Sequence, residues 1–198
     1  MDNHVLFLIT GYARAGKDTL AEGIKAGARN RDVFHLNMAD FLKEASNEYL
    51  KAVNEFSLGV ADFRKESFKV ANRAFLVEAG RMARSINVDV FAEAFVERCI
   101  KIAAIDYKSH RKPCAFICSD WRYMNELTVP EAVLGQAGWK IIKLRIDTAG
   151  VGPANEEEGL SIGEITRKVP IDYQFTAVPN SADTIRREGQ SLALLLEI

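Results

Sequence analysis

Two glycines, a lysine and an acid lie near the start of the chain at a spacing suited to holding phosphate. The segment reads Gly11-Tyr12-Ala13-Arg14-Ala15-Gly16-Lys17-Asp18-Thr19. Glycines let a backbone wrap closely around an anion, successive N–H groups form a nest for it, and a lysine reaches the β and γ phosphates as a point charge. The pattern G-x-x-x-x-G-K therefore predicts a loop that binds a nucleoside triphosphate, with ATP and Mg²⁺ as the expected ligands. A chance glycine-rich turn is the alternative.

Asp18 stands where this pattern usually continues with serine or threonine. Two roles are open for it. Its carboxylate either ligates Mg²⁺, directly or through water, or complements the positive end of the following helix. Thr19 is then either a hydroxyl ligand of the metal or an ordinary helical residue. We take Lys17 and Asp18 as candidate catalytic residues, and Asp18, Thr19 and Asp120 as candidate metal ligands.

A second polar group follows the apolar run at residues 114–118 and contains Asp120, Arg122 and Glu126. Asp120 could bind Mg²⁺ through water or accept a hydrogen bond from a phosphoryl acceptor. Arg122 could hold phosphate bidentately, with Glu126 orienting it, so all three are candidate catalytic residues. The alternative is the start of a helix, with Asp120 as its cap and Glu126 in a surface ion pair.

Four further residues are candidates for binding a second substrate, together with Arg122: Asp40, Lys43, Arg81 and Arg84. The two arginines lie three residues apart, a spacing that could clamp a monophosphate on one helix face. Arg167, next to Lys168, is a further catalytic candidate, because closing cations stabilise the charge that spreads over a transferring phosphoryl group. The alternatives are a helix cap, solvated surface charges and an ordinary loop.

Hydrophobic spacing predicts the elements that position these residues. Strand-length apolar runs cover residues 5–10, 33–36, 114–118, 139–146 and 173–178. Helical spacing follows Lys17 and covers residues 40–50, 88–107, 125–136 and 182–196, with a mixed helical pattern over 59–86. Such alternation predicts an α/β fold with about five parallel strands and helices on both faces of the sheet. Ligands of these sheets bind beyond the carboxyl ends of the strands.

Composition limits the partners of the chain. With 198 residues and a formal net charge of −1, we expect one α/β domain without a broad basic surface for nucleic acid. Cys99, Cys114 and Cys118 are expected to be buried free thiols of a reducing cytoplasm. His4, His35 and His110 are treated as isolated, because none has Cys or Asp partners at ligand spacing.

A core strand begins almost at Met1, which leaves no room for a signal peptide, and no apolar run approaches membrane-spanning length. We therefore expect a cytoplasmic protein, in the host cytoplasm if a phage encodes it, with no membrane partner. Its oligomeric state is open, with a homodimer as one option.

Taken in order, these blocks resemble phage-type deoxynucleoside monophosphate kinases, within the wider P-loop nucleoside monophosphate kinase group. The resemblance rests on the loop at residues 11–19, on Ala39-Asp40-Phe41-Leu42-Lys43, on the block from Ser119 to Glu126, and on Asp172-Tyr173-Gln174-Phe175-Thr176 after a lid-like segment. It spans most of the chain but is patchy between residues 50 and 110. Residues 177–181 depart from the Asn-Asp-Gly-like turn that the family often has near the adenine.

The resemblance implies a P-loop kinase three-layer fold and transfer of the γ-phosphoryl of ATP to a deoxynucleoside monophosphate (dNMP), giving dNDP and ADP with Mg²⁺ present. It implies one domain, with a core at about 1–37, 111–146 and 170–198, a substrate-binding helical insertion at about 38–110 and a lid at about 147–169. It also gives Asp18, Asp120, Arg122 and Glu126 roles near the reacting phosphates.

Three rival functions stay open. One is a kinase of another small phosphorylated metabolite, such as dephospho-coenzyme A. Another is a GTP-binding switch, although the chain has no Asn-Lys-x-Asp guanine motif after a strand. The third is a non-catalytic nucleotide sensor that kept the loop.

Overall fold

We describe a computed structural model of the chain that covers residues 3–53 and 62–198. The first half of the described chain contains β1 Val5–Thr10, α1 Lys17–Gly27, β2 Asp32–His35, α2 Met38–Val53, α3 Glu66–Ala71, α4 Arg73–Ile86 and α5 Val90–His110. The second half contains β3 Cys114–Cys118, α6 Asn125–Pro130, the π-helical turn η1 Glu131–Gly135, β4 Lys140–Thr148, α7 Glu156–Lys168, β5 Tyr173–Ala177 and α8 Ala182–Leu195.

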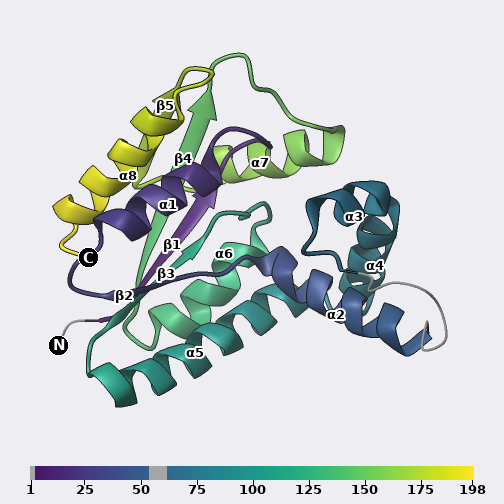
Figure 1. Cartoon of the computed structure of the whole chain (residues 1–198), viewed down its shortest axis with the longest axis horizontal. Coiled ribbons are helices and arrows are strands. Elements are labelled where there is room, and N and C mark those ends of the chain that lie inside the picture. The colour runs from purple at the N-terminus through teal and green to yellow at the C-terminus, as the bar shows by residue number, and fades with distance from the viewer. Residues whose placement is uncertain (1–2, 54–61) are drawn as a thin grey trace.

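The five described strands form one parallel sheet in the order β2-β3-β1-β4-β5 (Figure 1). Central β1 pairs with β3 on one side, with Val5 opposite Ala115, and with β4 on the other, with Val5 opposite Lys140. Helices cover both faces of the sheet, so the predicted α/β fold class, a parallel sheet of about five strands with helices on both faces, is confirmed. All strands run the same way, and their carboxyl ends therefore meet at one edge.

Alternation along the strands divides the core into two layers. On one face, Phe7 and Ile9 of β1 pack with Leu20 and Ile24 of α1 and with Leu192 of α8. On the other face, Leu6 and Leu8 meet residues of α5, α6 and α7, including Phe95, Leu127 and Ile165. Every residue of β1 and β3 is buried, as expected for strands covered on both faces.

Helices α2, α3 and α4 form a lobe beside the sheet (Figure 1). Aromatic packing joins them, since the rings of Phe63 and Phe75 stack at 5.6 Å and those of Tyr49 and Phe75 at 6.1 Å. The lobe lies within the predicted insertion at 38–110, and the helical prediction for 59–86 is confirmed from Glu66 onward. Residues 59–61 of that prediction lie outside the described residues.

Helix α7 corrects one expectation about local structure. The segment at 147–168 was expected to be a loop or lid, but residues 156–168 are helical. Asn155 caps this helix by accepting the Glu158 backbone N–H at 2.8 Å, and three glutamates in the first turn complement the helix dipole. Its role as a lid stays a prediction. Among residues 3–53 and 62–198, no helix has both the length and the apolar character to cross a membrane.

Candidate active site at the carboxyl edge of the sheet

The glycine loop connects β1 to α1 and takes a shape that only some residues allow. Gly11 has φ +148°, and a Cβ there would lie 2.3 Å from the backbone oxygen of Ile146. Gly16 has φ +92° and immediately precedes α1, which begins at Lys17. Arg14 also adopts a left-handed backbone, with φ +68°, a strained conformation that is typical of binding loops. The predicted strand, loop and helix are all present.

Lys17 lies inside the curve of this loop. Its Nζ donates hydrogen bonds to the backbone oxygens of Gly11 at 2.7 Å and Tyr12 at 2.8 Å. Burial lowers the pKa of Lys17 from its ordinary value, and the nearby charge of Arg122 lowers it further.

Glu158 is a site residue that the sequence analysis missed. Its side chain is buried, and one oxygen, Oε1, accepts the Ala13 backbone N–H of the loop at 3.2 Å and lies 3.3 Å from Arg122 Nη2. The other oxygen, Oε2, accepts the Ala154 N–H at 2.7 Å. A carboxylate from α7 therefore lies where a loop amide and Arg122 converge. The capping pattern Asn155-x-x-Glu158 was the available signal, because it predicts a helix start.

Asp18 belongs to a hydrogen-bonded group at the ends of β2 and β3. Ser119 Oγ lies 2.5 Å from Asp18 Oδ1 and 3.0 Å from Asn37 Oδ1, and its single hydrogen serves one of them at a time. His35 Nε2 lies 2.8 Å from the same Oγ, and it donates to that oxygen when Ser119 donates to Asp18. The expectation that His35 is isolated is therefore wrong. The signal was its place at the carboxyl end of a strand.

Asp120 holds the start of helix α2. Its Oδ1 accepts the Met38 N–H at 3.0 Å, and its Oδ2 accepts the Ala39 N–H at 2.8 Å. The expected alternative of a helix cap is thus present, but on α2 and not on the helix that follows Asp120. Asp40 completes this helix start, because its Oδ2 accepts the Asn37 N–H at 3.0 Å while Oδ1 binds Lys43 at 2.8 Å.

Glu126 positions the backbone before α6. It is 5% exposed, and its Oε2 accepts the N–H groups of Arg122 at 2.6 Å and Tyr123 at 3.0 Å. The expected contact with Arg122 is therefore made to its backbone and not to its guanidinium group, which pairs with Glu158. The surface ion pair considered for Glu126 is wrong, since the residue is buried.

The two candidate arginines of α4 lie in different surroundings. Arg84 lies over the rings of Tyr123 at 4.8 Å and Phe91 at 5.0 Å, next to the block that contains Arg122. Arg81 is exposed and pairs with Glu78 at 2.8 Å on its own helix. The structure therefore brings Arg84, and not Arg81, to the residues that follow β3.

Arg167 lies in the last turn of α7, nine residues after Glu158. A helix rises about 1.5 Å per residue, so these two positions are about 13 Å apart along the axis. Arg167 is exposed, whereas Glu158 at the other end of the helix contacts the loop. Its expected role in phosphoryl transfer stays a prediction that requires α7 to move.

The carboxylates at this edge differ in how many oxygen lone pairs they leave available to coordinate Mg²⁺. Asp18 is exposed and accepts a hydrogen bond from the Ser119 hydroxyl on Oδ1, so other lone pairs of its carboxylate are open to solvent beside the loop. Both oxygens of Asp120 already accept backbone N–H groups. The arrangement therefore favours Asp18, with the half-buried Thr19 next to it, over Asp120 as a ligand of a hard cation.

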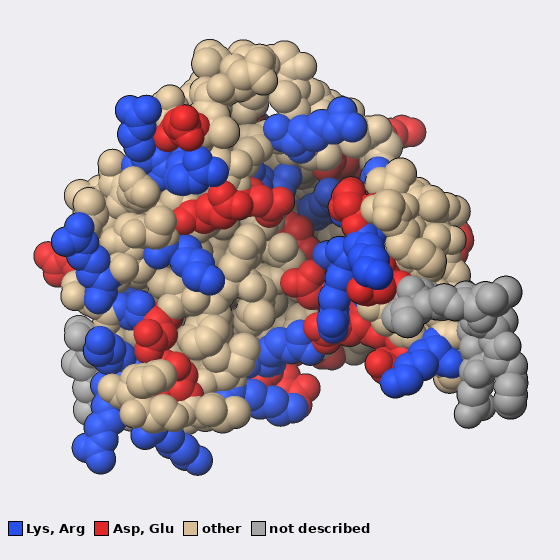
Figure 2. Space-filling view, in the orientation of Figure 1, with Lys and Arg blue, Asp and Glu red and all other residues tan. Residues whose placement is uncertain are grey.

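Figure 2 shows charged side chains of both signs around a hollow beside the lobe. The sequence predicted most of the cations at this edge. It missed Glu158, which pairs with Arg122, and it missed the hydrogen-bonded neighbours of Asp18, namely Ser119, Asn37 and His35.

No model of a known protein family matches the chain, and no curated protein matches it. Among solved structures, the chain is similar to an unliganded sugar kinase from Janibacter sp. HTCC2649, with 10% identity, a TM-score of 0.45 and coverage of 99% of this chain and 97% of the other. It is also similar to a "putative kinase" from Chloroflexus aurantiacus, with 11% identity, a TM-score of 0.47 and coverage of 98% and 97%. Both structural similarities are distant. The proposed function therefore rests on the residues of this chain.

Proposed function

We propose that this protein transfers the γ-phosphoryl group of ATP to a small phosphorylated acceptor, with a deoxynucleoside monophosphate as the first choice. One observation carries the proposal. The Glu158 carboxylate bonds to a loop amide at 3.2 Å and to Arg122 at 3.3 Å, so an anion fits between the loop and a facing arginine. A phosphoryl group in that place would contact the donor loop on one side and Arg122 on the other.

In-line transfer requires positioning and charge stabilisation more than covalent chemistry. Lys17 and the loop amides hold the donor phosphates, and Arg122 stabilises the charge that develops on the transferring group. Mg²⁺ would supply charge neutralisation between donor phosphates, with Asp18 and Thr19 as its nearest protein groups. Because the acceptor is already anionic, the chain needs no strong general base.

Arg84 and Arg122 are the proposed binding groups for the acceptor phosphate. Both flank Tyr123, since the guanidinium group of Arg84 lies 4.8 Å from its ring and Arg122 is its neighbour in the chain. Helices α2 to α4 then cover the acceptor from the side. The choice of a dNMP rests on the resemblance of the sequence blocks, and base contacts near residues 177–181 are left unassigned.

An acceptor panel tests this proposal. Purified protein is incubated with ATP and Mg²⁺ plus one dNMP, one ribonucleotide monophosphate or dephospho-coenzyme A at a time, and products are separated by ion-exchange chromatography. Conversion of at least one dNMP to dNDP supports the assignment. Phosphorylation of dephospho-coenzyme A alone would move the chain to its main rival, and GTP hydrolysis that ignores every acceptor would favour a switch protein.

A further inference from the structure

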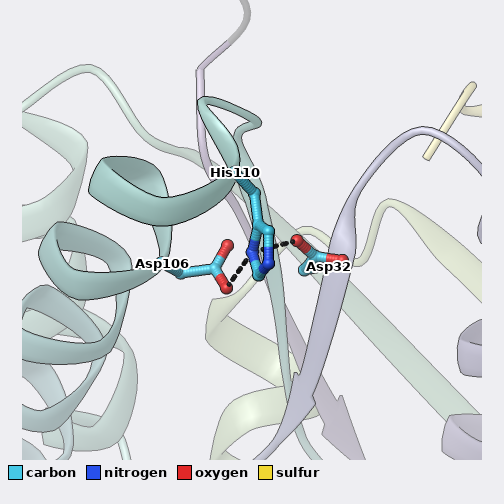
Figure 3. A group of neighbouring side chains, drawn as sticks. All are labelled: Asp32, Asp106 and His110. Atoms are coloured by element: carbon cyan, nitrogen blue, oxygen red, sulfur yellow. Dashed lines mark hydrogen bonds and ion pairs between the residues drawn. The ribbon is translucent and has the colours of Figure 1, made fainter.

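A second group of ionisable side chains lies at the amino edge of the sheet, opposite the glycine loop. Asp32 is the first residue of β2, Asp106 and His110 lie near the end of α5, and Cys114 is the first residue of β3. Figure 3 shows the two carboxylates on either side of the His110 ring. The expectation that His110 is isolated is wrong, because the spacing of four residues places it on the same helix face as Asp106.

The distances within this group suit coordination of one ion. His110 Nδ1 lies 3.0 Å from Asp106 Oδ1 and 3.2 Å from Asp32 Oδ2, and the three ligand atoms lie within 4.8 Å of one another. Tetrahedral zinc with bonds of about 2.0 Å separates neighbouring ligand atoms by about 3.3 Å. The observed spacings to His110 are therefore close to two edges of such a site, and small rotations of the exposed Asp32 and His110 side chains would complete it.

A hydrogen bond from a neighbouring thiol orients the Asp106 carboxylate. The buried Cys114 thiol donates to Asp106 Oδ2 at 3.3 Å, and the other oxygen, Oδ1, lies toward His110. A neutral thiol that orients a carboxylate is the kind of outer partner that metal ligands require.

Charge around the group also permits a cation. Asp32 and Asp106 bring two acidic side chains to the group. The side chains of His110 and Asp32 are 58% and 43% exposed, so an ion and its remaining water ligands can enter from solvent.

We propose that Asp32, Asp106 and His110 bind a divalent transition-metal ion, with zinc as the best fit to one imidazole and two carboxylate ligands. The Nδ1 atom of His110 coordinates in the tautomer that carries its proton on Nε2. The bound ion ties the start of β2 to the end of α5. This site lies at the opposite edge from the glycine loop, so its role is structural and does not depend on the function proposed for that loop.

Titration of the metal-free full chain with ZnCl₂, followed by calorimetry, tests this site. The variants Asp32→Asn and His110→Ala each remove one ligand at an exposed position, and Glu97→Gln, which removes an exposed carboxylate from the same helix, is the matched control. We expect one equivalent of Zn²⁺ to bind to the native chain and to the control. Each ligand variant should bind at least tenfold more weakly.

Thermal unfolding gives a second readout that is independent of kinase activity. Zn²⁺ should raise the Tm of the native chain and of Glu97→Gln, but not that of His110→Ala, because an ion that binds only the folded state stabilises it. Circular dichroism confirms that each variant is folded before titration. Absence of Zn²⁺ binding by the native chain would reduce the group to an ordinary ion pair, and unchanged binding in both ligand variants would place the ion elsewhere. Either result overturns the proposal.

Discussion

At the scale of single residues, the carboxylate of Glu158 occupies the position that the proposed function assigns to phosphate. It is buried, it accepts the Ala13 N–H, and it pairs with Arg122. A triphosphate that enters the loop must compete with this carboxylate for the same amide and would meet its charge at short range. Glu158 therefore opposes nucleotide binding until α7 moves or the side chain turns away.

The variant Glu158→Gln tests this competition. The amide keeps the shape of the side chain but removes its charge, so binding of a non-hydrolysable ATP analogue should tighten about tenfold, which corresponds to about 1.4 kcal/mol. Isothermal titration measures the change. Glu156→Gln, in which an exposed glutamate of the same helix turn changes, should bind as the native chain does. Weaker binding by Glu158→Gln would mean that the carboxylate assists the nucleotide.

Arg84 and Arg81 make a matched pair for the acceptor site. Arg84 lies over Tyr123 beside the proposed acceptor phosphate, whereas Arg81 pairs with Glu78 in solvent. Arg84→Ala should raise KM for the acceptor by about tenfold or more, the loss expected for one charge-assisted contact, with KM for ATP nearly unchanged. Steady-state kinetics with each substrate varied in turn measures both constants. Equal effects of Arg81→Ala and Arg84→Ala would remove Arg84 from the site.

Glu126 gives a prediction about pH. Burial, and then the charge of Asp120, raise its pKa from the ordinary 4.5 to about 7. Since the folded pKa lies above the unfolded one, this residue's contribution to stability is complete below pH 4.5 and is lost as the pH rises to about 7. The shift corresponds to about 3 kcal/mol.

Urea unfolding of the native chain and of Glu126→Gln across pH 4.5 to 8 measures this contribution. The amide does not ionise, so the native chain should lose about 3 kcal/mol relative to the variant over that range. Glu97→Gln, with an exposed side chain, should follow the native curve. Native and Glu126→Gln curves that run parallel would show that folding does not raise the pKa of Glu126.

At the scale of elements, close packing of α1 against α8 sets the position of the loop. A Cβ at Gly23 of α1 would lie 2.2 Å from the Arg186 backbone oxygen of α8, and a Cβ at Gly189 of α8 would lie 2.5 Å from the Leu20 oxygen of α1. The absence of side chains at these positions lets the two helix backbones approach. Because α1 begins at the loop, this contact also anchors Lys17.

Two helical glycine substitutions separate packing from helix propensity. Gly23→Ala should destabilise the fold by about 1–3 kcal/mol, since backbone atoms must shift to admit the methyl group. Gly163→Ala in α7, where a Cβ would meet no atom within 4 Å, should stabilise it by about 0.5–1 kcal/mol through helix propensity. Urea unfolding measures both. Similar effects at the two positions would refute the close approach of α1 and α8.

Elements were predictable where local spacing decides them. The runs 5–10 and 114–118 became β1 and β3, because a strand buried on both faces must be apolar throughout. Helix α7 was missed since Gly159 and Gly163 made its sequence look like a loop, although Asn155 and Glu158 form a cap. Contacts between distant segments, such as Asp120 with the start of α2, depend on how the strands are ordered and were not predictable from spacing.

At the scale of the whole molecule, the parallel sheet separates two kinds of chemistry. The glycine loop, Arg122 and the group around Asp18 gather at the carboxyl edge, as expected for open parallel sheets. The proposed metal ligands gather at the amino edge. The common direction of the strands places these groups at opposite edges, and β2, β3 and β1 are neighbours in the sheet. Because the two groups lie at opposite edges of the sheet, we predict that removal of Zn²⁺ lowers the stability of the fold and leaves phosphoryl transfer unchanged.

The rate of ADP release with ATP, Mg²⁺ and a dNMP tests the central claim most directly. A coupled spectrophotometric assay compares the native chain with Lys17→Ala and Arg122→Ala, whose folding is checked by circular dichroism. We predict release that depends on the dNMP, and a loss of at least a hundredfold in kcat/KM for each variant, because each removes a charge that holds the reacting phosphates. Absence of ADP with every dNMP, or near-native turnover by Arg122→Ala, would contradict the account.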